Sequence, residues 1–154
     1  MNFQENKQEI QKIINSFSGR IIEIGGPTPG GFVVVNELGF TVPDKITVTN
    51  ISNQVIINPF GKNPTMQDVD MIADVTALPF KDNEIDMIIS SSLPFSLHEA
   101  LFSESKRVLI PGGLLIVENQ NDEDKQRAKK YNYSPLLESS IADKVFSQVY
   151  LKIK

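Results

Sequence analysis

The sequence has no cysteine, only one histidine (His98) and no long apolar run. Without cysteine, the protein can form no disulfide and can use no thiolate as a nucleophile or metal ligand. A single histidine leaves little for a zinc site, so we expect no metal centre. No segment reaches the ~18 consecutive apolar residues that span a bilayer. Residues 1–17 also lack the apolar core of a secretory signal, and the default expectation is a cytoplasmic protein.

Acidic residues outnumber basic ones, giving a net charge of -4 and a sequence pI of about 5.0. Such a surface gains little from a phosphate backbone, which disfavours a nucleic-acid partner. A chain of 154 residues has the size of one ordinary domain and buries about two thirds of its unfolded surface. We therefore expect a single domain with three parts: an N-terminal helix (1–18), a ligand-binding core (20–118), and a C-terminal helix with an edge strand (119–154).

Short apolar runs alternate with helical patterns along most of the chain. Ile10, Ile14 and Phe17 recur at helical spacing and predict an N-terminal helix that Gly19 ends. Five further runs predict strands, at Arg20–Ile24, Lys45–Asn50, Asp70–Asp74, Ile85–Ser90 and Leu114–Glu118. The alternation favours an α/β fold with a doubly wound, mostly parallel sheet.

Weaker patterns predict the remaining elements. Helices are expected at Phe32–Leu38, from Ser96 to Val108 and, as a charged and solvated segment, at Asp122–Lys130. Ser96 and Glu99 have the spacing of a capping box, and Pro111-Gly112-Gly113 is expected to end that unit. Residues 51–69 are expected to be mostly irregular with an extended piece at 55–57, and Leu136–Ile141 to form a further turn or two. The alternation in Val145–Ile153 predicts an edge or antiparallel strand.

The first strand ends in a glycine-rich turn, where Gly25 and Gly26 let the backbone adopt positive φ and approach a ligand. A P-loop is disfavoured because Gly31-Phe32 stand where its lysine and hydroxyl residue belong. A dinucleotide fingerprint is disfavoured because Pro27 occupies the position of its second glycine. Pro27 and Pro29 also remove two backbone donors that a pyrophosphate needs. The same prolines disfavour a nicotinamide-dependent oxidoreductase.

A nucleoside without phosphates fits this turn better. Ligands of open α/β sheets bind at the carboxyl ends of the strands. A nucleoside there needs close backbone approach after strand one, a ribose partner after strand two and an adenine slot after strand three. The candidates in that order are Gly25 and Gly26, then Asn50, then Asp74 with Val75.

Three motifs then follow one another along the chain. They are Glu23-Ile-Gly25, then Asp74-Val-Thr-Ala-Leu-Pro-Phe-Lys-Asp82 with Asp86 opening strand four, and Glu104-Ser-Lys-Arg-Val-Leu-Ile-Pro-Gly-Gly-Leu-Leu-Ile-Val117. In this order they resemble the class I S-adenosylmethionine-dependent methyltransferases, in particular the small type-11 group that includes quinone-pathway enzymes. The resemblance implies a Rossmann-like methyltransferase topology, S-adenosylmethionine as the cofactor, and methyl transfer to an acceptor that the sequence does not identify.

The resemblance also implies roles for individual residues. Glu23 and Gly25 would lie against the methionine part of the cofactor. Asp74 would accept a hydrogen bond from the adenine amino group, and Val75 would flank the ring. The cofactor contacts expected in all are Glu23, Gly25, Gly26, Thr28, Asn50, Asp74, Val75 and Ser90. Ser90 and Ser91 would face the reacting end.

Methyl transfer does not require a protein base, because the cofactor supplies the electrophile and the protein supplies alignment. The only catalytic candidates are His98, as a general base, and Ser91, which would line the reacting end. For His98 the alternative is a solvated position on the helix surface.

The chain departs from the family pattern at several points. Pro27 and Pro29 replace glycines of the turn, and Asn50 or Asn53 stands where strand two normally ends in an acid. Only one of two final strands is evident, which leaves open whether the sheet has all seven. Without an inserted cap, a substrate would be a small molecule covered by another subunit or by the N-terminal helix, or would be presented by a partner. These departures also keep a second hypothesis, a non-catalytic methyltransferase-like binding or regulatory module.

Overall fold

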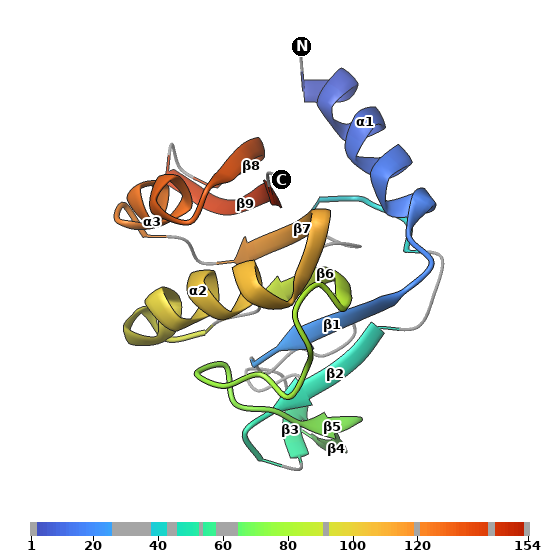
Figure 1. Ribbon diagram of the computed structural model, residues 1–154, viewed down its shortest axis with the longest axis vertical. Coiled ribbons are helices and arrows are strands. Elements are labelled where there is room, and N and C mark those ends of the chain that lie inside the picture. The colour runs from blue at the N-terminus through green and yellow to red at the C-terminus, as the bar shows by residue number, and fades with distance from the viewer. Residues whose placement is uncertain are drawn as a thin grey trace.

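The computed structural model describes residues 3–25, 38–42, 46–52, 54–57, 65–90, 93–118, 121–141 and 144–152. Its centre is a seven-stranded sheet with the order β5-β2-β1-β6-β7-β9-β8 (Figure 1). Strands β5, β2, β1, β6 and β7 run parallel to one another. Strand β9 is antiparallel to β7, and β8 is antiparallel to β9. The expected doubly wound, mostly parallel α/β sheet is confirmed.

The parallel strands match the apolar runs of the sequence. Their bounds are Arg20–Ile24 for β1, Ile46–Asn50 for β2, Met71–Ile72 for β5, Ile85–Ser90 for β6 and Leu109–Glu118 for β7. All six residues of β6 are buried, as a strand covered on both faces requires. The expected third strand is reduced to the two residues of β5 at the sheet edge.

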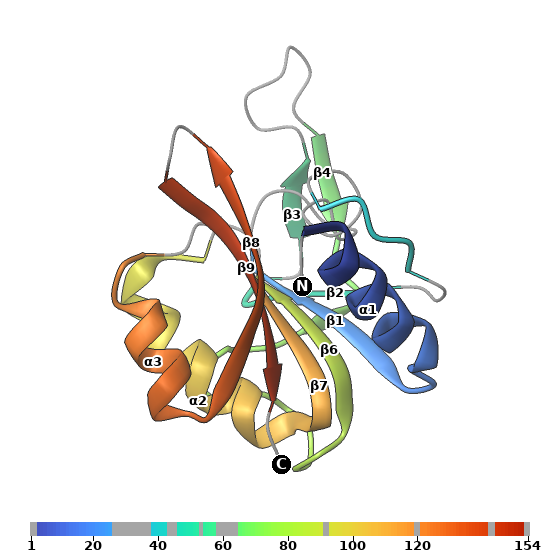
Figure 2. The same cartoon turned by 90° about the horizontal axis from the view of Figure 1, so that it is seen from above.

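Helices cover both faces of the sheet, which Figure 2 shows with α1 on one side and α2 and α3 on the other. The helices are α1 (Phe3–Ser16), α2 (His98–Val108) and α3 (Asp124–Lys130).

One hydrophobic core joins Ile10 and Ile14 of α1 to Ile21, Met87 and Leu114. The other joins Leu101, Phe102 and Val108 of α2 to Ile22, Ile88 and Leu115. Successive strand residues thus pack on opposite faces. Within the described residues, no helix is both long and apolar enough to cross a membrane.

The C-terminal region forms a hairpin, β8 (Tyr133–Ile141) and β9 (Lys144–Lys152). The helical turn expected at Leu136–Ile141 is therefore wrong, and the sheet has all seven strands. Strand β9 pairs on both sides, so the edge is β8 and not the strand expected there. The sequence of β8 does not look like a strand, because it contains Pro135 and a polar run after Leu137. An edge strand tolerates proline because one side of its backbone needs no hydrogen-bond partner.

The smaller expectations are met in part. The extended piece expected at 55–57 is confirmed as part of β3 (Gln54–Ile57), and β3 pairs antiparallel with β4 (Thr65–Asp68), a strand that the sequence did not predict. Residues 53 and 58–64 of this stretch lie outside the described residues. The capping box is wrong, because a 3-10 turn runs into α2, whose N-cap is Leu97 without a side-chain bond. The Pro-Gly-Gly segment lies within β7. Helix α3 is not solvated throughout, since Asp124 and Ala128 are buried. Residues 32–37 of the helix expected at 32–38 lie outside the described residues.

The junction between α1 and β1 gives a first prediction. The backbone N–H of Gly19 donates to Oδ2 of the buried Asp86 at 2.7 Å. A Cβ on Gly19 would lie 2.6 Å from Asp86 Oδ1. Gly19→Ala should therefore displace the carboxylate and lower the free energy of unfolding by about 1–3 kcal/mol, measured by urea denaturation. The neighbouring Ser18→Ala is the control, and equal stability of the two variants would contradict this account.

Candidate functional site

The turn after β1 begins with a glycine in a left-handed conformation. Gly25 has φ of 67°, which favours glycine because it has no Cβ. Its N–H donates to the carbonyl of Thr49 at 3.2 Å. The hydroxyl of Thr49 donates in turn to the carbonyl of Glu23 at 2.7 Å. The positive φ expected at Gly25 is confirmed, and these bonds tie the carboxyl ends of β1 and β2 together.

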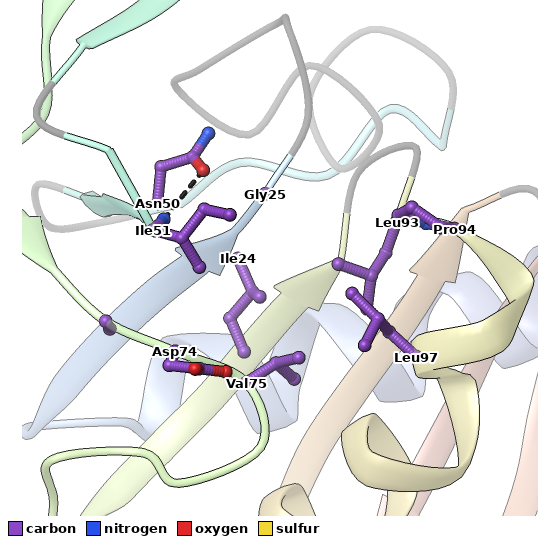
Figure 3. A pocket seen from close by; sticks show the side chains of 10 residues that line it. Ile24, Gly25, Asn50, Ile51, Asp74, Val75, Leu93, Pro94 and Leu97 are labelled. Carbon is purple, nitrogen blue, oxygen red and sulfur yellow. Dashed lines mark hydrogen bonds between the residues drawn. The ribbon is translucent and has the colours of Figure 1, made fainter.

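A cavity of about 170 Å³ opens beside this turn. Its lining comes from the ends of β1 and β2, the segment after β5 and the segment after β6 (Figure 3). The lining residues are Ile24, Gly25, Asn50, Ile51, Ala73, Asp74, Val75, Leu93, Pro94 and Leu97. The cavity thus lies at the carboxyl ends of neighbouring parallel strands, where ligands of open α/β sheets bind.

Two sides of this cavity are apolar. Ile51 lies on one side and Leu93 and Leu97 on the other, with Ile24 and Val75 between them (Figure 3). Ile51 is 71% exposed, a costly position for an isoleucine unless a ligand covers it. The sequence reasoning missed Ile51, although an apolar residue directly after Asn50 was a usable signal. It also missed the wall made by residues 93–97.

Asn50 closes the end of β2 with its own side chain. Its Oδ1 accepts the N–H of Ile51 at 2.7 Å, the dashed line in Figure 3. That bond uses one of the two lone pairs of Oδ1 for the turn. Within the described residues, Nδ2 makes no hydrogen bond, so its two hydrogens can be donated to a ligand.

Asp74 is an exposed carboxylate oriented by a neighbouring threonine. Its Oδ1 accepts the backbone N–H of Thr76 at 2.9 Å and the Thr76 hydroxyl at 2.7 Å. The backbone bond first and the hydroxyl bond second lower the pKa of Asp74. Within the described residues, Oδ2 accepts no hydrogen bond. One oxygen therefore shapes the turn, and the other remains an acceptor.

The loop after Asp74 is held by α2. Glu104 accepts the N–H of Leu78 at 2.8 Å. Arg107 donates to the carbonyls of Leu78 and Phe80 at 3.0 and 2.8 Å, and to Glu104 at 2.7 Å. The second and third sequence motifs are thus in direct contact. Their Leu-Pro-Phe and Glu-x-x-Arg residues form a clamp that fixes the path of the chain beyond the cavity.

The other predicted site residues lie in different surroundings. Glu23 and Ser90 are fully buried and do not line the cavity. The hydroxyl of Ser90 has no hydrogen-bond partner among the described residues. His98 is also fully buried, so its expected solvated position is wrong. Its ring contacts Asp124 and the carbonyl of Leu93. Three predicted residues, Gly26, Thr28 and Ser91, lie outside the described residues.

The site combines an apolar slot with a small number of polar groups. Asp74 offers a carboxylate acceptor and Asn50 an amide donor, both at the rim of the slot. This set suits a flat heterocycle with an exocyclic amino group, joined to a hydroxylated sugar. No cluster of three or more candidate metal ligands occurs in the part of the chain that the structure describes.

The contact between Thr76 and Asp74 gives a second prediction. Thr76→Val removes the hydroxyl bond and keeps the larger backbone contribution, so the Asp74 pKa should rise while staying below its usual value. A lowered pKa in the folded state stabilises the protein above the unfolded pKa, and this contribution is lost as pH falls. The variant should therefore gain less stability from ionisation of Asp74. Carboxyl NMR titration measures the shift. Thr41→Val is the control, and an unchanged midpoint in Thr76→Val would refute the assignment.

Comparison with known proteins identifies the family. The model of a family described as "Methyltransferase domain" matches residues 28–117, more than half of the 154 residues. No curated protein matched the chain. A structure described as a SAM-dependent methyltransferase from Aquifex aeolicus has a TM-score of 0.54 at 16% identity, covering 97% of this chain and 90% of its own.

Two further solved structures share the fold. The CurJ carbon methyltransferase has a TM-score of 0.56 and 14% sequence identity to this chain. The superposition covers 97% of this chain but only 54% of the CurJ chain. A further match is a chain in the complex between the Haloferax volcanii Trm112 methyltransferase activator and a methyltransferase. Its TM-score is 0.54 at 11% identity, and the superposition covers 98% of this chain and 92% of the matched chain. At these identities the superpositions show the fold alone. The family match carries the assignment: the chain belongs to the methyltransferase-domain family of class I methyltransferases, whose cofactor is S-adenosylmethionine.

Proposed function

We propose that this protein is an active methyltransferase and that the cavity beside Gly25 binds the adenosine part of S-adenosylmethionine. One observation carries the proposal. Gly25, Asn50, Asp74 and Val75 come from three separate segments, were expected as cofactor contacts, and line the same apolar cavity. At about 170 Å³ the cavity is smaller than the ~300–1,000 Å³ of a site for a whole drug-sized ligand. It suits the nucleoside end of the cofactor.

In this proposal the adenine ring lies between Ile51 and Leu97, with Val75 against its edge. The free Oδ2 of Asp74 accepts a hydrogen bond from the adenine amino group. The Nδ2 group of Asn50 donates to a ribose hydroxyl, because its Oδ1 is already bonded to the Ile51 N–H. The ring would cover Ile51, which accounts for an exposed isoleucine at the rim.

The methionine end would run from Gly25 along the turn. Glu23, Gly26 and Thr28 remain proposed contacts there, with Ser90 and Ser91 near the reacting end. The cofactor supplies the activated methyl group, and the protein aligns it with the acceptor. Neither His98 nor Ser91 is needed as a base. The acceptor is a small molecule or a group presented by a protein partner or second subunit, and the partner in the Haloferax volcanii complex supports a role for another chain.

The alternative function is a non-catalytic module that keeps the fold. It is favoured by the commitment of Asn50 to its own turn, because an acid at that position would offer stronger bonds to both ribose hydroxyls. Transfer of labelled methyl groups from S-adenosylmethionine to a panel of small molecules and protein extracts separates the two. Cofactor binding without transfer would favour the module.

Calorimetric titration with S-adenosylhomocysteine tests the cofactor assignment. Native protein should bind, and Asp74→Ala should lower affinity about tenfold because the adenine amino group loses an acceptor. Asp74→Asn, which keeps one acceptor oxygen, should lose less. Asp122→Ala removes an exposed acid outside the cavity lining and is the control. Absence of binding by well-folded native protein would overturn the proposed site.

The apolar side of the slot gives an independent prediction. Ile51→Ala should weaken binding of S-adenosylhomocysteine about fivefold, or about 1 kcal/mol, because less apolar surface is covered by the ring. Ile72→Ala is a matched control, since Ile72 is 61% exposed but does not line the cavity. Equal losses of affinity in the two variants would argue against adenine contact at Ile51.

A further inference from the structure

His98 is a buried imidazole held between two acceptors. Its exposed fraction is 0%. Nδ1 lies 2.8 Å from Oδ2 of Asp124, and Nε2 lies 3.1 Å from the carbonyl oxygen of Leu93. A carbonyl oxygen can only accept, so Nε2 must carry a hydrogen to bond with Leu93.

Asp124 has the contacts of an ionised carboxylate. Oδ1 accepts from Nη1 of Arg127 at 2.8 Å, and Oδ2 accepts the backbone N–H of Asn121 at 3.0 Å. An ionised carboxylate can only accept, so Nδ1 of His98 must carry a hydrogen as well. With an ionised Asp124, this geometry has both ring nitrogens of His98 acting as donors, one to Asp124 and one to the Leu93 carbonyl.

Through Leu93, His98 also contacts the segment that forms one wall of the cavity. Leu93 and Leu97 line the cavity, and the N–H of Leu97 donates to the carbonyl of Pro94 at 2.9 Å. Phe95 packs edge-on against the His98 ring, with centroids 5.3 Å apart. His98 thus lies directly behind the wall and reaches from it to the first residue of α3.

We propose that His98 is a positioning residue for the adenosine cavity: through its two N–H groups it fastens the wall at residues 93–97 to Asp124. This inference rests on the proposed function for the identity of the ligand, but not for the geometry of the wall. Without the Nε2 bond, the Leu93 carbonyl loses its partner at the place where the chain turns into the cavity. The wall then relaxes, and the slot no longer matches a flat ring.

Holding α2 against α3 without affecting the cavity would be a different role for His98. The neighbouring residue Glu99 distinguishes the two roles. Glu99 joins the same helices by accepting bonds from Arg127, Lys130 and Tyr131. The bond from Lys130 first, then that from Tyr131, lowers the pKa of Glu99 to about 2. Glu99 does not line the cavity. Glu99→Gln therefore loosens the two helices without removing the bond to Leu93, and serves as the matched control.

Hydrogen exchange of the ligand-free protein tests the wall itself. His98→Gln can bond to one of the two acceptors but cannot span both. The amides of Leu97 and residue 98, which donate to the carbonyls of Pro94 and Phe95, should therefore exchange about tenfold faster than in native protein. Glu99→Gln should leave this segment near the native rate. In nitrogen-edited NMR of native protein, both ring nitrogens of His98 should show attached protons. A single protonated nitrogen, or equal exchange in both variants, would overturn the proposal.

Binding of S-adenosylhomocysteine then tests the link to the cavity. His98→Gln and Asp124→Asn should each weaken affinity about tenfold, and the double variant should be no weaker than either, because the two residues act as one unit. Unchanged affinity in a folded His98→Gln protein, or an equal loss in Glu99→Gln, would refute positioning. If His98→Gln does not fold, the Asp124→Asn affinity and the native NMR spectrum decide. Failure of native protein to bind would refute the proposed function, while the exchange data still decide whether His98 holds the wall.

Discussion

Parallel pairing of β1 with β2 and β6 is the constraint on which the site depends. In the register of the sheet, Ile24 pairs with Thr49 on one side and Ser90 on the other. Because neighbouring strands run in the same direction, their carboxyl ends meet at one edge. Residues from distant parts of the chain therefore gather beside Gly25. The bond from Gly25 N–H to the Thr49 carbonyl then holds the end of β1 against β2 at the place where the cavity begins.

The parts of the fold that the sequence predicts are those that local pattern determines. Strands β1 and β6 are buried on both faces, so their sequences are mainly apolar, interrupted by Glu23 in β1 and Asp86 in β6, and have clear limits. Strand β8 has no such signature, because it contains Pro135 and exposed Glu138 and is stabilised by pairing with β9. The two-residue β5 is similarly defined by its neighbour β2 and not by its own length. The pairing partner of such a strand is not encoded in the pattern of the strand itself.

The same distinction applies to the site. Gly25 directly follows β1, Asn50 ends β2 and Asp74 lies just beyond β5, so their position at the sheet edge follows from the order of elements. The sequence left His98 as either a general base or a solvated residue on the helix surface, yet it is fully buried. Its burial depends on Asp124, 26 residues later, and on the packing of α3 against α2. A buried polar residue needs its partner, and neither local periodicity nor helix position reveals that partner.

The polar groups that the cavity offers to a ligand depend on which hydrogen bonds the side chains of Asp74 and Asn50 already make. Among the described residues that line it, Asp74 is the only ionisable one, and one of its oxygens accepts two bonds from Thr76. The side-chain oxygen of Asn50 accepts the Ile51 N–H. The cavity therefore has one directed acceptor and one directed donor set in an apolar slot. Specificity at such a site comes from the shape of the slot and the placement of these two groups, because little charge is available to attract a ligand from a distance. Shape in turn depends on rigid surroundings. His98 with Asp124 holds the wall at Leu93 from behind, while Glu104 and Arg107 hold the loop that follows Asp74 at Leu78.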